Sequence, residues 1–257
     1  MCRSKEERDA ATKSFAGGGG AAVLLVVLVI AGWWFFIRED AQLATDAPEI
    51  PQELLQATEV PSSAEDGAGA SDGSGASDVL TFRIIPEQSE AAYFAGEKLA
   101  SLPLPSTATG ATREIDGEFH LTADGTALAP ARESRFTVDL RTLTSNESRR
   151  DNRVREALGT HLYPFAAFTV SDVTGYDPAI PESDDQFLTL TGILDLHGVQ
   201  REVTWDVEGH REANVITALA TVTFPFADFN ITPPNIAGFV SVEDEVTLQI
   251  QIIAQVV

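Results

Sequence analysis

The chain has 257 residues, of which 44% are hydrophobic, so it is long enough for one large or two small domains. Its formal net charge of -22 argues against binding nucleic acid or anionic lipid headgroups through a basic surface. The single cysteine, Cys2, excludes an internal disulfide and a cysteine-based metal site.

An apolar, uncharged segment, residues 21–37, comes early in the chain. Extended back through residues 17–20, it reaches the roughly 20 residues that a bilayer-spanning helix needs. The flank before it carries Arg3, Lys5, Arg8 and Lys13, whereas Arg38 alone follows it. The positive-inside rule therefore predicts a single-pass signal anchor, with a cytoplasmic N-terminal segment over residues 1–20 and an exported C-terminal domain, periplasmic or extracellular. A cleaved signal peptide is the alternative, although its apolar core normally spans only about 7 to 15 residues.

Residues 38–77 predict a disordered acidic linker. The segment carries nine carboxylates against one arginine and ends in a run of Gly, Ala, Ser and Asp, GAGASDGSGAS. A segment of this composition cannot bury enough apolar surface to fold. We therefore expect the folded domain to occupy residues 78–257.

Apolar and polar residues alternate along most of residues 78–257, as they do in strands with one buried face. The clearest case is residues 188–196 followed by residues 203–207, and His197-Gly198 between them is typical of a tight hairpin turn. Further alternating segments are residues 80–85, 90–94, 115–121, 136–140, 166–171, 216–224 and 246–252. The pattern predicts an all-β domain of eight or nine antiparallel strands.

One short helix interrupts the strands. Residues 149–158 contain no Pro or Gly, Ser148 or Asn146 can serve as the N-cap, and Gly159 can end the helix. Asp151 and Arg155 are spaced as a helical pair. Tyr163-Pro164 then forces extended backbone, so the predicted order is helix, turn, strand.

Strands with one apolar face must bury it in a sandwich or a closed barrel. A barrel of about eight strands either fills itself with side chains or holds one small ligand. Two features favour a hollow barrel: Ala166, Ala218 and Ala220 would leave volume on apolar faces, and the helix over residues 149–158 is placed to cover a barrel end. A solid core is the alternative.

Three motifs in this domain resemble the YceI-like family of polyisoprenoid-binding proteins. They are Arg150-Asp151 with Tyr163-Pro164 and Phe168; the hairpin Thr191-Gly192-Ile193-Leu194-Asp195-Leu196-His197-Gly198-Val199; and Asp228-Phe229-Asn230-Ile231 with the strand over residues 242–250. The resemblance covers about Leu80 to the C-terminus and implies an antiparallel lipocalin-like barrel of about eight strands. The sequence departs from the family at Asn230, where Gly is usual, and by an insertion over residues 96–110. This insertion would be a lid over a ligand, a rim that touches the membrane, or a loop packed on the barrel wall.

The sequence offers no constellation for catalysis. None of the four histidines has metal-ligand spacing: His120 is expected on a solvent-facing strand face, and His161 and His197 in turns. The arginines of residues 149–155 would either contact a polar headgroup at the barrel mouth or form a solvated helix face, and we favour the latter. We expect no catalytic residues, no metal site and no enzymatic activity.

The sequence thus predicts a membrane-anchored, extracytoplasmic barrel that binds a long-chain isoprenoid lipid or quinone without turnover. The alternative is a solid barrel whose acidic surface binds an envelope protein. The expected partners are the lipid and, through the N-terminal helix, the membrane; no nucleic acid is expected, and a homodimer is left open. No cofactor is expected apart from a bound isoprenoid or quinone. The predicted ligand-binding residues are Phe119, Phe136, Val138, Phe168, Leu190, Leu194, Val203, Trp205, Ala218, Ala220, Val246 and Leu248.

Overall fold

The computed structural model of the chain describes residues 42–56, 79–99, 106–236 and 240–257. The predicted cytoplasmic segment (1–20), the predicted membrane anchor (21–37) and most of the predicted linker (38–77) lie outside these ranges. Among the helices of the described ranges, none combines the length and hydropathy that crossing a bilayer requires. The described residues from Leu43 onward belong to one compact unit, Leu43–Val257.

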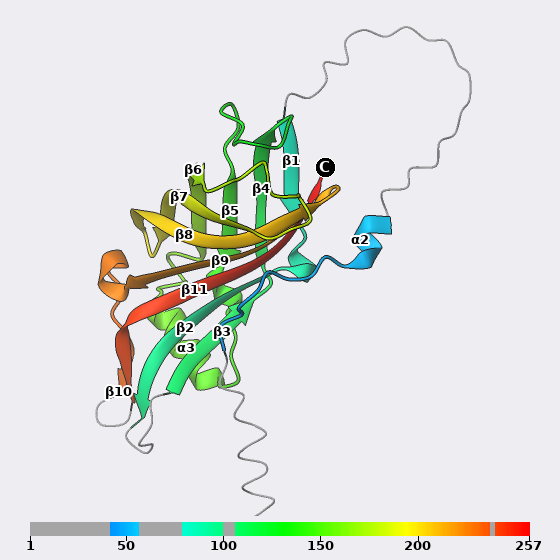
Figure 1. Ribbon diagram of the computed structural model, residues 1–257. Coiled ribbons are helices and arrows are strands. Elements are labelled where there is room, and N and C mark those ends of the chain that lie inside the picture. Colours follow the sequence, from blue (N-terminus) through cyan, green and yellow to red (C-terminus); the bar gives the residue numbers. More distant parts are fainter. Residues whose placement is uncertain (1–41, 57–78, 100–105, 237–239) are drawn as a thin grey trace, which may run out of the picture. The chain divides into compact units, whose positions relative to one another are not determined.

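The described strands form one antiparallel sheet that closes on itself (Figure 1). Eight of them follow one another around the closed ring in the order β1-β4-β5-β6-β7-β8-β9-β11, and β1 pairs with β11 to complete it. The closing register joins Phe82 to Val256 and Ile84 to Ala254. The predicted barrel of about eight antiparallel strands with one short helix is confirmed.

The strand bounds place every predicted segment on a strand. They are β1 Val79–Ile84, β2 Glu90–Leu99, β3 Ser106–Thr112, β4 Ile115–Thr122, β5 Arg135–Asp139, β6 Phe165–Thr174, β7 Gln186–Leu196, β8 Val199–Glu212, β9 Val215–Pro225, β10 Asn235–Ile236 and β11 Val240–Val256. Three 3-10 turns, η1 Pro86–Gln88, η2 Leu140–Thr142 and η3 Phe226–Phe229, connect or end strands. The short β10 pairs only with β11.

The β7–β8 hairpin forms as the sequence predicts. His197 (φ 55°) and Gly198 (φ 72°) both adopt positive φ, the conformation that a two-residue turn matching strand twist requires. The pairing then runs from Leu196 opposite Val199 to Gln186 opposite Gly209. Because side chains alternate along a strand, this register turns the leucines of β7 and Trp205 of β8 toward the interior.

Residues 96–110, predicted as a lid or a loop on the barrel wall, are largely strand. β2 pairs with β3 from Ala91 opposite Thr112 to Glu97 opposite Ser106, and residues 100–105 lie outside the described ranges. The loop prediction was wrong here because β3, with the sequence STATGAT, carries no large apolar residue that would mark it as a strand.

The predicted helix is α3, Ser148–Ala157. Its N-cap is Glu147, whose side chain accepts a hydrogen bond from Arg149 N at 3.1 Å, rather than Ser148 or Asn146. Gly159 ends it with φ 56°, as predicted. Asp151 does not pair with Arg155 as predicted, because its carboxylate accepts two hydrogen bonds from Ser145 instead. Arg155 instead donates to Leu143 O and to Asn152.

Part of the predicted disordered linker has a defined place in this fold. Residues 43–51 belong to the same compact unit as the barrel strands and lead into a short helix, α2 Gln52–Gln56. The buried Gln249 of β11 holds Ala44 by two hydrogen bonds, accepting from Ala44 N at 2.8 Å and donating to Ala44 O at 3.0 Å. The linker predicted over residues 38–77 thus includes a residue that is hydrogen-bonded to the barrel, a contact that leaves no trace in composition.

Candidate functional site

A cavity of about 380 Å³ lies inside the barrel beneath α3. Its wall is almost entirely apolar and comes from strands on every side, including Val138 of β5, Leu194 of β7 and Leu248 of β11. Val154, Ala157 and Leu158 of α3 also line it. The helix therefore lies over this end of the barrel, as the sequence suggested.

A second cavity, of about 520 Å³, occupies the other part of the interior. Phe82 and Ile84 of β1, Phe119 of β4 and Ala218 of β9 line it, together with the polar His210, Arg211 and Glu182 at its outer end. The interior is thus hollow, and the solid core that the sequence left open is not what this fold contains. We call the two cavities the helix chamber and the far chamber.

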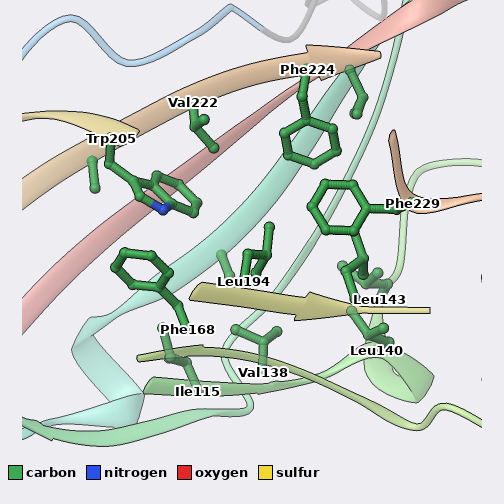
Figure 2. Packing of buried hydrophobic residues seen from close by; sticks show 14 of the residues in the cluster. Ile115, Val138, Leu140, Leu143, Phe168, Leu194, Trp205, Val222, Phe224 and Phe229 are labelled. Atoms are coloured by element: carbon green, nitrogen blue, oxygen red, sulfur yellow. The ribbon is translucent and has the colours of Figure 1, made fainter. Parts of the chain in front are cut away.

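Four residues line both chambers and mark the place where they adjoin, which we call the waist: Phe136, Phe168, Trp205 and Ile250. Phe168 and Trp205 meet there edge to face, with ring centroids 5.8 Å apart and planes at 60°. Figure 2 shows the two rings facing each other, with the indole nitrogen on the side of Trp205 that is turned toward Phe168. Gly192 makes this possible, because a Cβ at that position would lie 2.8 Å from the Phe168 ring.

Charged side chains gather at the outer end of the helix chamber. Arg149, Arg150 and Arg153 of α3 line it together with Glu97 of β2. Glu97 is buried and accepts from Arg150 at 3.4 Å and from Ser106 at 3.1 Å. Arg149 and Arg153 are exposed, and neither forms an ion pair with another described residue. The sequence favoured a solvated face for these arginines, whereas three of them border the chamber.

Tyr93 of β2 also lines the helix chamber. Burial raises the pKa of its phenol to about 12, and the nearby Arg150 offsets only part of that rise. Gly110 on the paired strand β3 leaves room for the ring, since a Cβ there would lie 2.7 Å from it. The phenol therefore stays neutral at ordinary pH, as a polar group on an apolar wall.

Eleven of the twelve predicted ligand-binding residues line a chamber. Val138, Leu194, Val246 and Leu248 border the helix chamber. Phe119, Leu190, Ala218 and Ala220 border the far chamber. Phe136, Phe168 and Trp205 lie at the waist. The twelfth, Val203, borders neither and packs on the hydrophobic core.

Sequence reasoning missed the polar groups at both ends of the interior. Glu97, Tyr93 and the arginines of α3 come together only when β2 and the helix meet, and no local motif joins them. The expectation for His120 was also wrong: it is buried, because Ala129 and Ser134 of the following loop bond to its main chain and cover the outer face of β4. His161 and His197 lie in turns, as predicted.

An eight-stranded antiparallel barrel with an apolar, hollow interior is the architecture of small-ligand binding proteins of the lipocalin kind. The family model of the YceI-like domain matches residues 82–254, which is most of the chain. The protein belongs to the YceI-like family. Members of this family are binding proteins rather than catalysts. No curated protein matches the sequence.

Two solved structures share the fold. BcnA of Burkholderia cenocepacia is 17% identical, with a TM-score of 0.51 over 67% of this chain and 99% of its own. A polyisoprenoid binding domain from Saccharophagus degradans, implicated in plant cell wall breakdown, is also 17% identical, with a TM-score of 0.54 over 69% of this chain and 99% of its own. At this level of identity the likeness concerns the barrel itself.

Proposed function

We propose that this protein binds a long-chain isoprenoid lipid or quinone inside the barrel and releases it unchanged. The observation that carries the proposal is the pair of adjoining apolar chambers, of about 380 and 520 Å³, within a YceI-like barrel. Ligand pockets in proteins typically have about 300–1,000 Å³ and a few polar groups on an apolar wall. A long, thin, apolar molecule fits two chambers in line better than one compact ligand would.

The energetics of an isoprenoid tail suit such walls. Each buried methylene contributes roughly 0.8 kcal/mol, so one five-carbon isoprene unit contributes about 4 kcal/mol before the costs of association are subtracted. Those costs are large for a flexible tail, because binding removes its torsional freedom. Two or three units in the chambers would nevertheless give useful affinity with few polar contacts, and the hollow interior favours this function over a solid scaffold with an acidic outer surface.

The lipid is best identified by mass spectrometry of an organic extract of the domain. We would express residues 43–257, which keep the contact of Ala44 with Gln249, with an export signal in a bacterial host. A bound isoprenoid or quinone near one molecule per protein is expected. An empty extract from folded protein that also fails to take up added long-chain isoprenoids would overturn the proposal.

A matched pair of variants ties the lipid to the chambers. Ala220→Phe adds a ring in the wall of the far chamber, and Thr204→Phe adds the same ring on the exposed face of the barrel wall. We expect the first variant to lose the lipid while staying folded, and the second to retain it. Equal retention in both would place the lipid outside the chambers.

We further propose that residues 21–37 anchor the protein in a membrane, with the barrel on the extracytoplasmic side. The proposal rests on the length of the apolar segment and on the basic residues before it. Alkaline extraction of membranes should leave the full chain in the pellet and release a chain lacking residues 1–37. Recovery of a mature N-terminus beyond residue 37 would instead establish the cleaved signal peptide.

A further inference from the structure

Trp205 carries a buried polar group that the protein itself leaves without a partner. The residue is 2% exposed, and its indole nitrogen has no hydrogen-bond partner among the described residues. Buried tryptophan N–H groups are usually paired, because an unpaired donor out of contact with water costs free energy. The unpaired group lies at the waist, where the two chambers adjoin.

The surroundings of Trp205 offer no strong acceptor. The other waist residues are Phe136, Phe168 and Ile250, none of which carries a polar side-chain atom. The Phe168 ring presents at most its π face, which is a weak acceptor compared with a carbonyl oxygen. A single trapped water is also a poor partner, since a buried water needs two to four polar contacts and this wall supplies one.

Among the described residues, no carboxylate, guanidinium or imidazole side chain lines both chambers. Those that line one chamber are Glu97, Glu147, Arg149, Arg150 and Arg153 in the helix chamber, and Asp172, Glu182, His210 and Arg211 in the far chamber. An anionic oxygen at the waist would therefore be stripped of water without a countercharge, which is strongly unfavourable. A neutral acceptor oxygen loses much less hydration and gains the indole donor.

We propose that Trp205 Nε1 donates a hydrogen bond to a neutral acceptor oxygen of the bound lipid, and that this contact selects oxygen-bearing lipids over plain hydrocarbons. The inference rests on the proposed lipid-binding function and narrows its ligand class. A ring carbonyl, as in a quinone, suits the position because Phe136 and Phe168 supply aromatic faces beside the donor. The tail then extends from the waist into a chamber.

The test uses two probes of nearly equal shape, measured by calorimetric titration of the full-length chain. One is 2-geranyl-1,4-benzoquinone; the other is 2-geranyl-1,4-dimethylbenzene, in which methyl groups replace both carbonyl oxygens. Wild-type protein should bind the quinone more tightly. Trp205→Phe should raise the Kd of the quinone about 2- to 12-fold, the range expected for one neutral hydrogen bond, and leave the Kd of the hydrocarbon nearly unchanged.

The control is Phe136→Leu, which trims a waist ring without removing a donor and should weaken both probes alike. An unchanged ratio of the two Kd values in Trp205→Phe would overturn the role of Trp205, whereas failure of both probes and of long-chain isoprenoids to bind wild-type protein would overturn the lipid-binding function itself.

A spectroscopic readout keeps the test independent of how Trp205→Phe folds. The chain has three tryptophans, so the indole signal of Trp205 in a ¹⁵N-labelled spectrum is assigned as the one that remains when Trp33 and Trp34 are both replaced by Phe. We expect the chemical shift of this N–H to move downfield when the quinone is added and to change little when the hydrocarbon is added. Equal shifts with both probes would contradict the hydrogen bond.

Discussion

At the scale of single residues, Asn230 shows how this chain departs from its family without leaving the fold. The residue ends η3 in the left-handed conformation, with φ 54°, which explains why Gly is usual there. Asn is among the few other residues that adopt this conformation at modest cost. The departure seen in the sequence therefore changes local strain and not the path of the chain.

Ala213, in the β8–β9 turn, adopts a similar conformation with φ 52° but has no such tolerance. Ala213→Gly should therefore stabilise the protein by up to about 1 kcal/mol, because relief of the left-handed strain exceeds the added entropy of the unfolded chain. Denaturant unfolding measures the change. Asn230→Gly should give a smaller gain, and a loss of stability in Ala213→Gly would contradict the strain assigned to this turn.

Tyr93 makes stability depend on alkaline pH. Its folded pKa of about 12 lies above the ordinary tyrosine value of 10.0, so the folded state holds the phenol proton more tightly. The contribution of the neutral phenol to the free energy of unfolding is fully present below pH 10. It is lost as the pH rises toward 12, at up to about 1.4 kcal/mol per pH unit. Tyr93→Phe should flatten this decline in urea unfolding experiments.

The same residue can be followed by its absorbance. The difference between the wild-type and Tyr93→Phe titrations, recorded at the wavelength where phenolate absorbs, should have its midpoint near pH 12 if the protein is still folded there. A midpoint near 10 in folded protein would mean that the ring is solvated.

At the scale of elements, Asp151 fixes α3 over the helix chamber. The buried carboxylate accepts from Ser145 N at 2.9 Å and from Ser145 Oγ at 2.6 Å, which joins the first turn of the helix to the loop before it. Asp151→Ala should cost about 1–3 kcal/mol, because a buried N–H is left without its partner. The exposed Asn152→Ala on the same helix should cost much less, and thermal unfolding of both variants tests the difference.

The elements that the sequence predicted are those with a strong local signal. The β7–β8 hairpin was found because its leucines alternate and His197-Gly198 can take positive φ, and α3 because Gly159 marks its end. β3 has neither signal: its small residues gain their place only by pairing with β2, which also lets Gly110 accommodate Tyr93. Pairing between segments is not visible in either segment alone.

At the scale of the whole molecule, the walls of the site were predictable and its polar ends were not. The inward positions of Phe168, Leu194 and Trp205 follow from strand alternation alone. The pairing of Arg150 with Glu97 joins a helix to a distant strand, so it depends on the closed fold. The role of Trp205 could not be read from the sequence either, since what distinguishes it is the lack of an acceptor around it.

The docked segment before the barrel should contribute to the stability of the whole domain. Gln249→Ala removes two hydrogen bonds to Ala44, and we expect a loss of about 1–2 kcal/mol in a chain that starts at residue 43. In a chain that starts at residue 78 the same substitution should cost less, because the segment is absent. Gln251→Ala, two residues along β11, serves as the control.

Equal costs of Gln249→Ala in the long and the short chain would show that the segment adds nothing in solution. The denaturant midpoints of the wild type and of Gln249→Ala, each in the long and the short chain, decide between these outcomes. The comparison requires that the slope of unfolding against denaturant concentration stays constant.

The pairing of β1 with β11 also fixes when the protein can first hold a ligand. These are the first and last strands of the barrel, so the wall stays open until β11 has been synthesised. Contacts between such distant parts of a chain form slowly, because the long loop must close first. A nascent chain would therefore expose its apolar interior until β1 pairs with β11. During that interval, the tail of the proposed lipid ligand can enter the barrel from the side, without passing through either end.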